Sequence, residues 1–346
     1  MILLYLAFVS LVFIPFPRFG NEGGSAGYLS KEAALPIKGL SLIFVFFRHF
    51  QQYVKLSDSI LDRCFLYIDG ISGQLIVVMF FFYSGYGIYE SIKIKQSSYI
   101  RGFLKKRFLP VWFNFAICIC FFLIFNLIAG RQKDLTTILL SFTGWTSIGN
   151  SNWFMFVTFV LYILIAACFI GFRRGGALPL ILFSVATAGT ALVLYWAKAE
   201  SPWWYNTIFC FPAGMWYSFF KDRIDGILSQ YYWGVFIALV LLNAALFYGL
   251  RFHSDVFCAF SVAFSLLVVT ITFKVRVRNP FLAELGKHVF SFYILQRLAF
   301  LMLSGLSSNI FLYFVSSFIL ALALSFSYDF LESGFRQFIT ARRWTR

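Results

Sequence analysis

Long apolar stretches separated by short polar connections limit what this chain of 346 residues can fold into. A backbone that crosses lipid must satisfy its hydrogen bonds internally, and about 20 apolar residues in a helix cross the hydrocarbon layer. The pattern predicts an all-α fold: a single-domain polytopic membrane helix bundle with ten or eleven transmembrane helices. The expected spans are residues 2–17, 36–54, 71–91, 109–128, 153–172, 177–197, 203–220, 231–250, 254–273, 288–304 and 309–331.

Composition agrees with a membrane protein and argues against a nucleic-acid partner. Hydrophobic residues make up 60% of the chain and charged residues only 12%, which is far from the usage of a soluble domain. A net charge of +15 would suggest nucleic-acid binding in a soluble protein, but here Lys and Arg lie in the connections between apolar spans. In that position they orient the protein in the membrane.

The distribution of Lys and Arg predicts the orientation. Alternate connections carry 21 of these residues on one side and 6 on the other, and cytoplasmic connections keep the positive charge. The C-terminus, with a basic tail over residues 332–346, is therefore predicted to be cytoplasmic. Residues 1–17 lack the basic start and the cleavage site of a signal peptide, so we expect an extra N-terminal transmembrane helix there. If this segment does not cross, both termini lie inside.

Side chains that could form a disulfide or bind a metal are few and scattered. The six cysteines lie mostly within spans and have no C-x-x-C spacing, so they are interpreted as small apolar side chains. Of the three histidines, His253 falls in a short outer connection and His288 at the start of a span. Both are interpreted as non-catalytic, and no metal site is expected.

One polar pair inside the second apolar stretch points to chemistry. Arg48 and His49 are adjacent and are expected at mid-depth, where a charge costs about 2.5–3.5 kcal/mol and normally faces a polar interior. A buried histidine titrates near neutral pH and accepts a proton from a hydroxyl, as a general base must. The alternative is a structural histidine that is hydrogen-bonded to a neighbouring helix.

Lys38 is predicted on the same helix face as His49. Eleven residues at about 100° each return to within about 20° of the starting direction and rise about 16 Å along the axis. A cation at the cytoplasmic mouth and a base deeper on the same face suit a long anionic donor that reaches into the membrane. A lysine at the helix end that extends to the interface explains Lys38 equally well.

Several segments, taken in order, resemble one enzyme family. Residues 38–49 contain a basic residue followed by ten residues and a histidine, residues 80–89 form an aromatic-rich stretch with Ser-Gly, and residues 99–110 are basic. Residues 152–162 begin with Asn-Trp-Phe, and residues 284–295 contain Leu-Gly, Ser and Tyr-x-Leu. The chain thereby resembles the acyltransferase 3 family of integral-membrane, acyl-CoA-dependent O-acyltransferases.

Two positions depart from the family pattern. The first motif position, commonly arginine in the family, is Lys38 here, which keeps the charge but loses the bidentate fork for a phosphate. Where many relatives carry a histidine after the Tyr-x-Leu run, this chain has Gln296 followed by Arg297. A second catalytic histidine is therefore not expected there, and Gln296 would be limited to hydrogen bonding.

The resemblance implies an acyl-CoA donor and a set of binding residues. The basic loop over residues 93–107 would hold the phosphates of CoA, and the small residues after the aromatic run would let the pantetheine arm approach. Orientation charge, helix packing and an interfacial tryptophan belt explain the same residues without a ligand. The expected donor-binding residues are Ser84, Gly85, Arg101, Lys105, Lys106 and Arg107, and the expected acceptor or pocket residues are Trp153, Tyr162, Tyr293 and Gln296.

The resemblance also implies the reaction. An acyl group, acetyl from acetyl-CoA in the simplest case, would pass to a hydroxyl of a cell-envelope polysaccharide or lipid-linked glycan at the bacterial cytoplasmic membrane. His49 would deprotonate the hydroxyl, while Lys38 or Arg48 orients the donor or balances the oxyanion. A transporter or flippase for a lipid-linked glycan or other anionic solute is the alternative, and a membrane anchor or partner-binding subunit is a third. Assembly as a homo-oligomer stays open.

Overall fold

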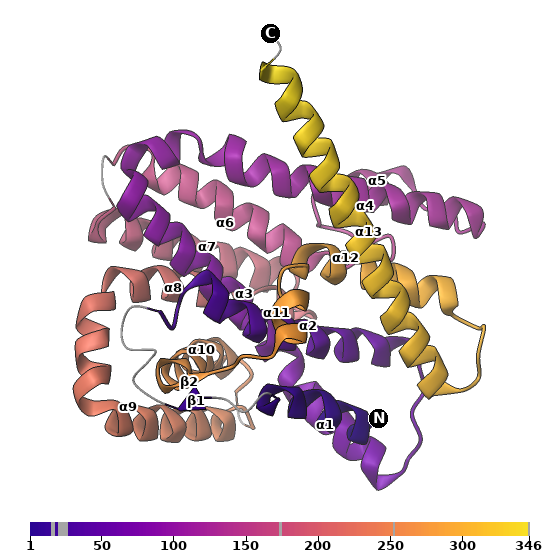
Figure 1. Ribbon diagram of the computed structural model, residues 1–346, viewed down its shortest axis with the longest axis horizontal. Helices are drawn as coiled ribbons and strands as arrows, with labels where there is room; N and C mark the ends of the chain where they lie inside the picture. The colour runs from indigo at the N-terminus through magenta and orange to yellow at the C-terminus, as the bar shows by residue number, and fades with distance from the viewer. Residues whose placement is uncertain (15–17, 20–26, 173–174, 252, 345–346) are drawn as a thin grey trace.

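A computed structural model describes residues 1–14, 18–19, 27–172, 175–251 and 253–344, and within these residues the fold is a bundle of thirteen α-helices (Figure 1). The β-structure in this part of the chain is one short antiparallel pair, in which Phe19 of β1 (Arg18–Phe19) lies opposite Val275 of β2 (Val275–Arg276). The predicted all-α membrane helix bundle is confirmed.

Most predicted spans correspond to one helix each. Among the described residues, seven helical stretches are long and apolar enough to cross a membrane, and there are three shorter apolar ones at Ile2–Phe13, Trp153–Phe169 and Val289–Leu303. Together they fall on ten of the eleven predicted spans. The helices are α1 (Ile2–Ser10), α2 (Lys31–Phe50), α3 (Ile60–Arg101), α4 (Leu109–Ile128), α5 (Leu135–Ser141), α6 (Trp153–Phe169), α7 (Ala177–Ala197), α8 (Cys210–Phe219), α9 (Lys221–Gly249), α10 (Val256–Lys274), α11 (Pro280–Leu285), α12 (Val289–Leu303) and α13 (Ile310–Trp344).

Helix α3 is much longer than its predicted span. It runs for 42 residues because it begins at Ile60, inside the expected polar connection, where the Ser59 side chain caps it by accepting from the Asp62 N–H. It continues to Arg101, apart from a non-helical residue at Gln96. A single π-helical turn, Leu104–Phe108, then leads into α4. The loop predicted over residues 93–107 is therefore wrong, since nearly all of that segment is helical.

The span predicted at 203–220 is also wrong in its extent. A 3₁₀ turn at Pro202–Trp204 comes first, and α8 has only 10 residues, Cys210–Phe219. Side chains bind the intervening segment to its neighbours: Asn206 donates to Gln74 of α3 at 3.3 Å, and its carbonyl accepts from Ser261 of α10 at 3.0 Å. Apolar composition alone did not distinguish this segment, which hydrogen bonds hold in a turn, from a helix.

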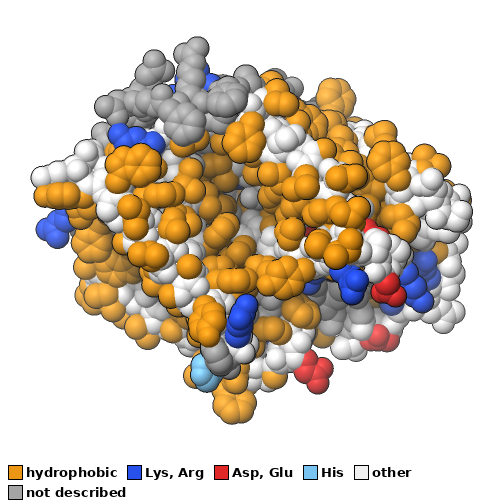
Figure 2. All heavy atoms as spheres, turned by 90° about the horizontal axis from the view of Figure 1, so that it is seen from below, with side chains coloured by type: hydrophobic (Ala, Val, Ile, Leu, Met, Phe, Trp, Pro, Cys, Tyr) orange, Lys and Arg blue, Asp and Glu red, His pale blue; other side chains and the backbone are white. Residues whose placement is uncertain are grey.

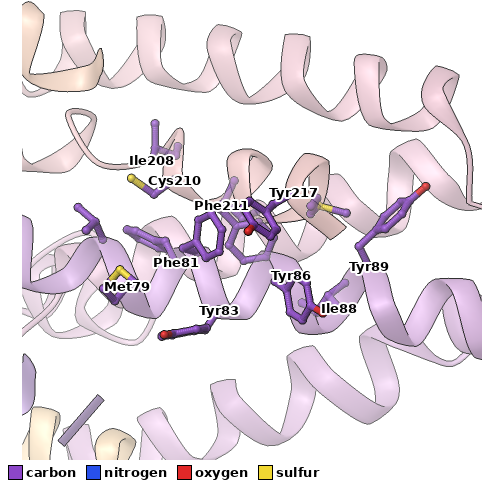
Figure 3. Close-up of a cluster of buried hydrophobic side chains, with 14 of the residues drawn as sticks. Met79, Phe81, Tyr83, Tyr86, Ile88, Tyr89, Ile208, Cys210, Phe211 and Tyr217 are labelled. Atoms are coloured by element: carbon purple, nitrogen blue, oxygen red, sulfur yellow. The ribbon is translucent and has the colours of Figure 1, made fainter. Parts of the chain in front are cut away.

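One of the two hydrophobic core clusters among the described residues surrounds the crossing of α3 and α8, and the other includes side chains of α2, α12 and α13. Two glycines permit the close approach of α3 and α8 because they have no side chain. A Cβ on Gly85 would lie 2.0 Å from the carbonyl oxygen of Phe211, and a Cβ on Gly214 would lie 2.1 Å from the carbonyl oxygen of Phe82. Phe81 of α3 packs with Phe211 of α8 in the buried cluster of Figure 3, in which Tyr83 lies on the side of α3 away from α8.

The outer surface is largely apolar. Hydrophobic side chains cover most of the face in Figure 2, and the charged ones lie mainly near its margins. Helix α9 illustrates this, since Trp233 and Leu241 are 70% and 63% exposed. Apolar surface of this extent does not face water in a soluble monomer, which agrees with a bundle immersed in lipid.

Candidate active site

One face of α2 lines a row of three cavities. The first, which we call the lysine cavity, has a volume of about 520 Å³ and contains Lys31 and Lys38. The second, the middle cavity, of about 540 Å³, also contains Lys38. The third, the histidine cavity, of about 320 Å³, contains His49 together with Val45 and Gln52. The predicted alignment of Lys38 and His49 on one face is therefore observed, since both side chains border this row.

The imidazole of His49 borders the histidine cavity. His49 is 8% exposed, and its Nδ1 has no hydrogen-bond partner among the described residues. Its ring lies 5.9 Å, centroid to centroid, from that of Tyr293. Within the described residues, no hydrogen bond fixes His49 to a neighbouring helix, as the structural alternative required. The ring faces the cavity, whose lining also includes Arg48, Gly73, Gln74, Val77, Ser147, Asn150, Asn152, Trp153, Trp203 and Arg297.

Arg48 has a carboxylate partner that the sequence did not suggest. Its Nη1 lies 3.3 Å from Oδ2 of Asp69 on α3, and this carboxylate is fully buried while the arginine is 36% exposed. Gly73 leaves room for the arginine, because a Cβ there would lie 2.7 Å from Nε. The Arg48 charge is thus largely balanced within the protein.

Arg48 and His49 do not lie at the middle of their helix. Both are in the last turn of α2, which begins at Lys31 and ends at Phe50. The helix starts five residues before the predicted span, and the depth of this pair in the membrane stays a prediction. Ser30 determines this start, since its side chain accepts from the Ala33 N–H at 3.1 Å.

Arg297 is a site residue that the sequence analysis did not select. It follows Tyr293 by one turn of α12, so both side chains reach the histidine cavity. Its Nη2 donates to Oε1 of Gln52 at 2.7 Å and its Nε to Oγ of Ser151 at 3.0 Å. The usable signal was the charge itself, since Arg297, like Arg48, falls well inside a predicted span.

The remaining walls of the histidine cavity come from connections that show no helical pattern. Ser147, Asn150 and Asn152 belong to the segment between α5 and α6, and Trp203 to the turn before α8. Asn126 of α4 fixes the first of these segments by donating to the Ile148 carbonyl at 2.8 Å. These residues escaped sequence analysis because their positions depend on how distant segments pack.

The lysine cavity gathers cations from separate elements. Lys38 lies over the Tyr83 ring, 5.6 Å from its centroid. Arg107 lines the same cavity from the turn before α4 and donates to the Tyr99 hydroxyl at 3.2 Å. Lys221, at the start of α9, also lines it and is paired with Asp225. These residues come from the more basic set of connections, which predicts that the lysine cavity faces the cytoplasm.

The middle cavity shares lining residues with each of the other two. Lys31, Lys38, Ser84 and Tyr162 line both it and the lysine cavity. Tyr293 lines both it and the histidine cavity. The Tyr293 hydroxyl is buried without a hydrogen-bond partner among the described residues. A row of cavities therefore leads along α2 from the lysines to His49, with Tyr293 between the last two.

The predicted site residues divide into two groups. Ser84, Arg107 and Tyr162 line the lysine cavity, and Trp153 and Tyr293 line the histidine cavity. The others line none of the three cavities: Gly85 packs against Phe211, Gln296 is buried with its amide donating to the Tyr293 carbonyl, and Arg101, Lys105 and Lys106 are exposed.

A family model described as an acyltransferase domain matches residues 37–329. The chain belongs to the acyltransferase 3 family. The match covers most of the chain and includes Lys38, His49, Tyr293 and Arg297, and it confirms the family resemblance found in the sequence. Comparison with curated proteins and with solved structures gives no match. Membership of the family makes this helix bundle a membrane acyltransferase.

Proposed function

We propose that the protein transfers an acyl group, acetyl in the simplest case, from acyl-CoA to a hydroxyl of a cell-envelope polysaccharide or lipid-linked glycan. The observation that carries the proposal is the row of cavities along one face of α2, from the basic lysine cavity to the imidazole of His49. An acyl donor with an anionic head and a long arm matches this arrangement, and the bacterial cytoplasmic membrane is the expected location.

The donor head fits the lysine cavity. Its lining includes one carboxylate, Glu90, and four cations, Lys31, Lys38, Arg107 and Lys221. Charge-assisted hydrogen bonds from such cations hold phosphates. Lys38 lies about 16 Å along the helix axis from His49, so a donor that binds there needs an extended arm. The middle cavity, which Ser84 and Tyr162 line, offers that arm a path to Tyr293.

The chemical step uses His49 as the general base. The imidazole accepts the proton of the acceptor hydroxyl as its oxygen attacks the thioester carbonyl carbon. The C–O bond forms, the C–S bond breaks, and the CoA thiolate leaves and takes up a proton. The unpaired Tyr293 hydroxyl beside the imidazole is placed to donate to the oxyanion. Because Arg48 is paired with Asp69, we assign it to positioning.

The acceptor fits the histidine cavity. Gln52, Gln74, Asn150 and Asn152 supply amide donors and acceptors for hydroxyl groups. Two tryptophans, Trp153 and Trp203, border the same space. A sugar presents hydroxyls and apolar ring faces, so this lining suits it. The connections that form this end belong to the less basic set, which predicts that the acceptor arrives from outside the cytoplasm.

Replacement of His49 by alanine tests the proposal. We expect transfer by the protein in nanodiscs, with acetyl-CoA as donor, to fall about 10²- to 10⁴-fold, as for loss of a general base, while the exposed His253→Ala control keeps wild-type activity. In cells, mass spectrometry of surface glycans should show loss of O-acetyl with normal polymer abundance. Loss of the polymer itself would support a transporter or flippase instead, and an unchanged glycan would support an anchoring role.

A further inference from the structure

We propose that the acceptor carries an acidic group, a carboxylate or a phosphate, and that Arg297 binds it. The inference rests on the proposed function, because it assigns a substrate class to the histidine cavity. Its basis is that this cavity contains a cation for which the described part of the protein supplies no counter-charge.

The two arginines of the histidine cavity differ in their partners. Arg48 makes an ion pair with the buried carboxylate of Asp69. Arg297 is bonded only to neutral oxygens among the described residues, those of Gln52 and Ser151. No Asp or Glu lines the cavity. The cavity therefore has a net positive charge close to His49.

The guanidinium keeps donors for a ligand. An arginine has five N–H donors in a planar fork, and the two bonds of Arg297 use Nε and Nη2. These bonds hold the plane of the group, which lowers the entropy lost when a ligand binds. Gln52 and Ser151 come from different segments, α2's end and the connection before α6, so the orientation of Arg297 is fixed from two sides.

A neutral sugar would not need this charge. The amides and tryptophans of the cavity already match hydroxyls and ring faces, whereas a half-buried arginine without a counter-ion carries a desolvation cost. A carboxylate or phosphate offsets that cost, and its geometry matches the fork of the guanidinium. Stabilisation of the reaction oxyanion is the competing role for Arg297, and it would act on every acceptor alike.

Binding measured without acyl-CoA tests the inference separately from catalysis. The protein in nanodiscs is titrated with methyl β-D-glucuronide, glucose 1-phosphate and the neutral methyl β-D-glucoside. We expect at least one acidic probe to bind about tenfold more tightly than the neutral glycoside. Preference for the glucuronide alone indicates a carboxylate on the sugar, and preference for glucose 1-phosphate alone indicates a phosphate that links the glycan to its carrier.

The variants identify the residue responsible. Arg297→Gln should abolish the difference between acidic and neutral probes, and Arg297→Lys should keep part of it because the charge remains. Arg131→Gln, which removes an exposed arginine from another connection, is the matched control and should bind like the wild type.

Equal binding of acidic and neutral probes to the wild type, or no binding of any probe, overturns the inference. So does an equal loss for all probes in Arg297→Gln, which would indicate a structural or oxyanion role. If the acidic preference is found but His49→Ala leaves acetyl transfer unchanged, the proposed catalytic function fails while the charge recognition stands.

Discussion

At the residue scale, the site depends on which polar groups have partners and which do not. Asp69 neutralises Arg48, whereas Nδ1 of His49 and the hydroxyl of Tyr293 are buried without partners among the described residues. Buried polar groups in folded proteins are normally hydrogen-bonded, and we propose that these two, whose residues line one cavity, are held for a substrate. We therefore expect replacement of Asp69 to affect stability and replacement of Tyr293 to affect catalysis.

Asp69→Asn should destabilise the protein, because it leaves the Arg48 charge without its partner. Breaking a buried pair costs about 3–5 kcal/mol, and we expect about 1–3 kcal/mol here since Arg48 is partly exposed. Denaturant unfolding in detergent measures the loss. The double variant Arg48→Gln with Asp69→Asn should recover part of the stability, and a double variant as unstable as the sum of the two single ones would contradict the pairing.

Tyr293→Phe should lower kcat about 10²-fold, as for removal of one oxyanion donor, with little change in the KM for acyl-CoA. The ring stays, so its packing on Phe154 and His49 is kept. Steady-state kinetics measures kcat and KM separately and so checks this expectation. Tyr67→Phe, which alters an exposed tyrosine, is the control, and a change in KM alone would assign Tyr293 to donor binding.

At the element scale, close helix crossings position the cavities. Helix α2 crosses α11 where a Cβ on Gly39 would lie 1.9 Å from the Leu282 carbonyl oxygen, and α3 crosses α8 at Gly85 in the same way. Such contacts between small residues bring membrane helices together. The prediction that Gly85 lets something approach α3 is thus explained by a helix, α8, and not by space for a ligand.

Gly85→Ala should destabilise the bundle, by about 1–3 kcal/mol or more, because the added methyl group meets the Phe211 backbone and α8 must shift. Gly70→Ala in the same helix is the matched control: its Cβ meets nothing within 4 Å, and alanine favours a helix. Thermal unfolding in detergent should show a lower Tm for the first variant only. Equal Tm values would mean that the crossing is looser than described.

At the scale of the whole molecule, the two ends of the cavity row are lined from different sets of connections. The lysine cavity is lined from the basic connections, and the histidine cavity from the others. Under the predicted orientation, the row spans the protein from the cytoplasmic side to the opposite side. Helix α13, whose C-terminal end projects from the bundle (Figure 1), carries the predicted cytoplasmic tail.

Labelling of single cysteines tests this orientation. In a background with Cys64→Ser and Cys120→Ser, which removes the exposed native thiols among the described residues, Lys133→Cys should react with a membrane-impermeant maleimide added to intact cells. Lys95→Cys should react only after permeabilisation, because it lies on the more basic side. Both side chains are exposed, so burial does not limit the reaction. The reverse pattern would invert the topology and place the lysine cavity outside.

The sequence by itself determined the helix bundle, the family and the stripe that joins Lys38 to His49. Hydrophobicity and helical period are local properties, so α4 and α7 match their predicted bounds of 109–128 and 177–197. The local pattern predicted helix bounds less well where a side-chain cap or a hydrogen-bonded turn sets them. Examples are the start of α3 at Ser59 and the segment before α8.

Only the tertiary structure decided which residues meet at the site. The pairing of Arg48 with Asp69 and the presence of Arg297 beside His49 both join separate helices. Such contacts depend on how helices cross and on where connections return, and the period of a single helix carries no information about either.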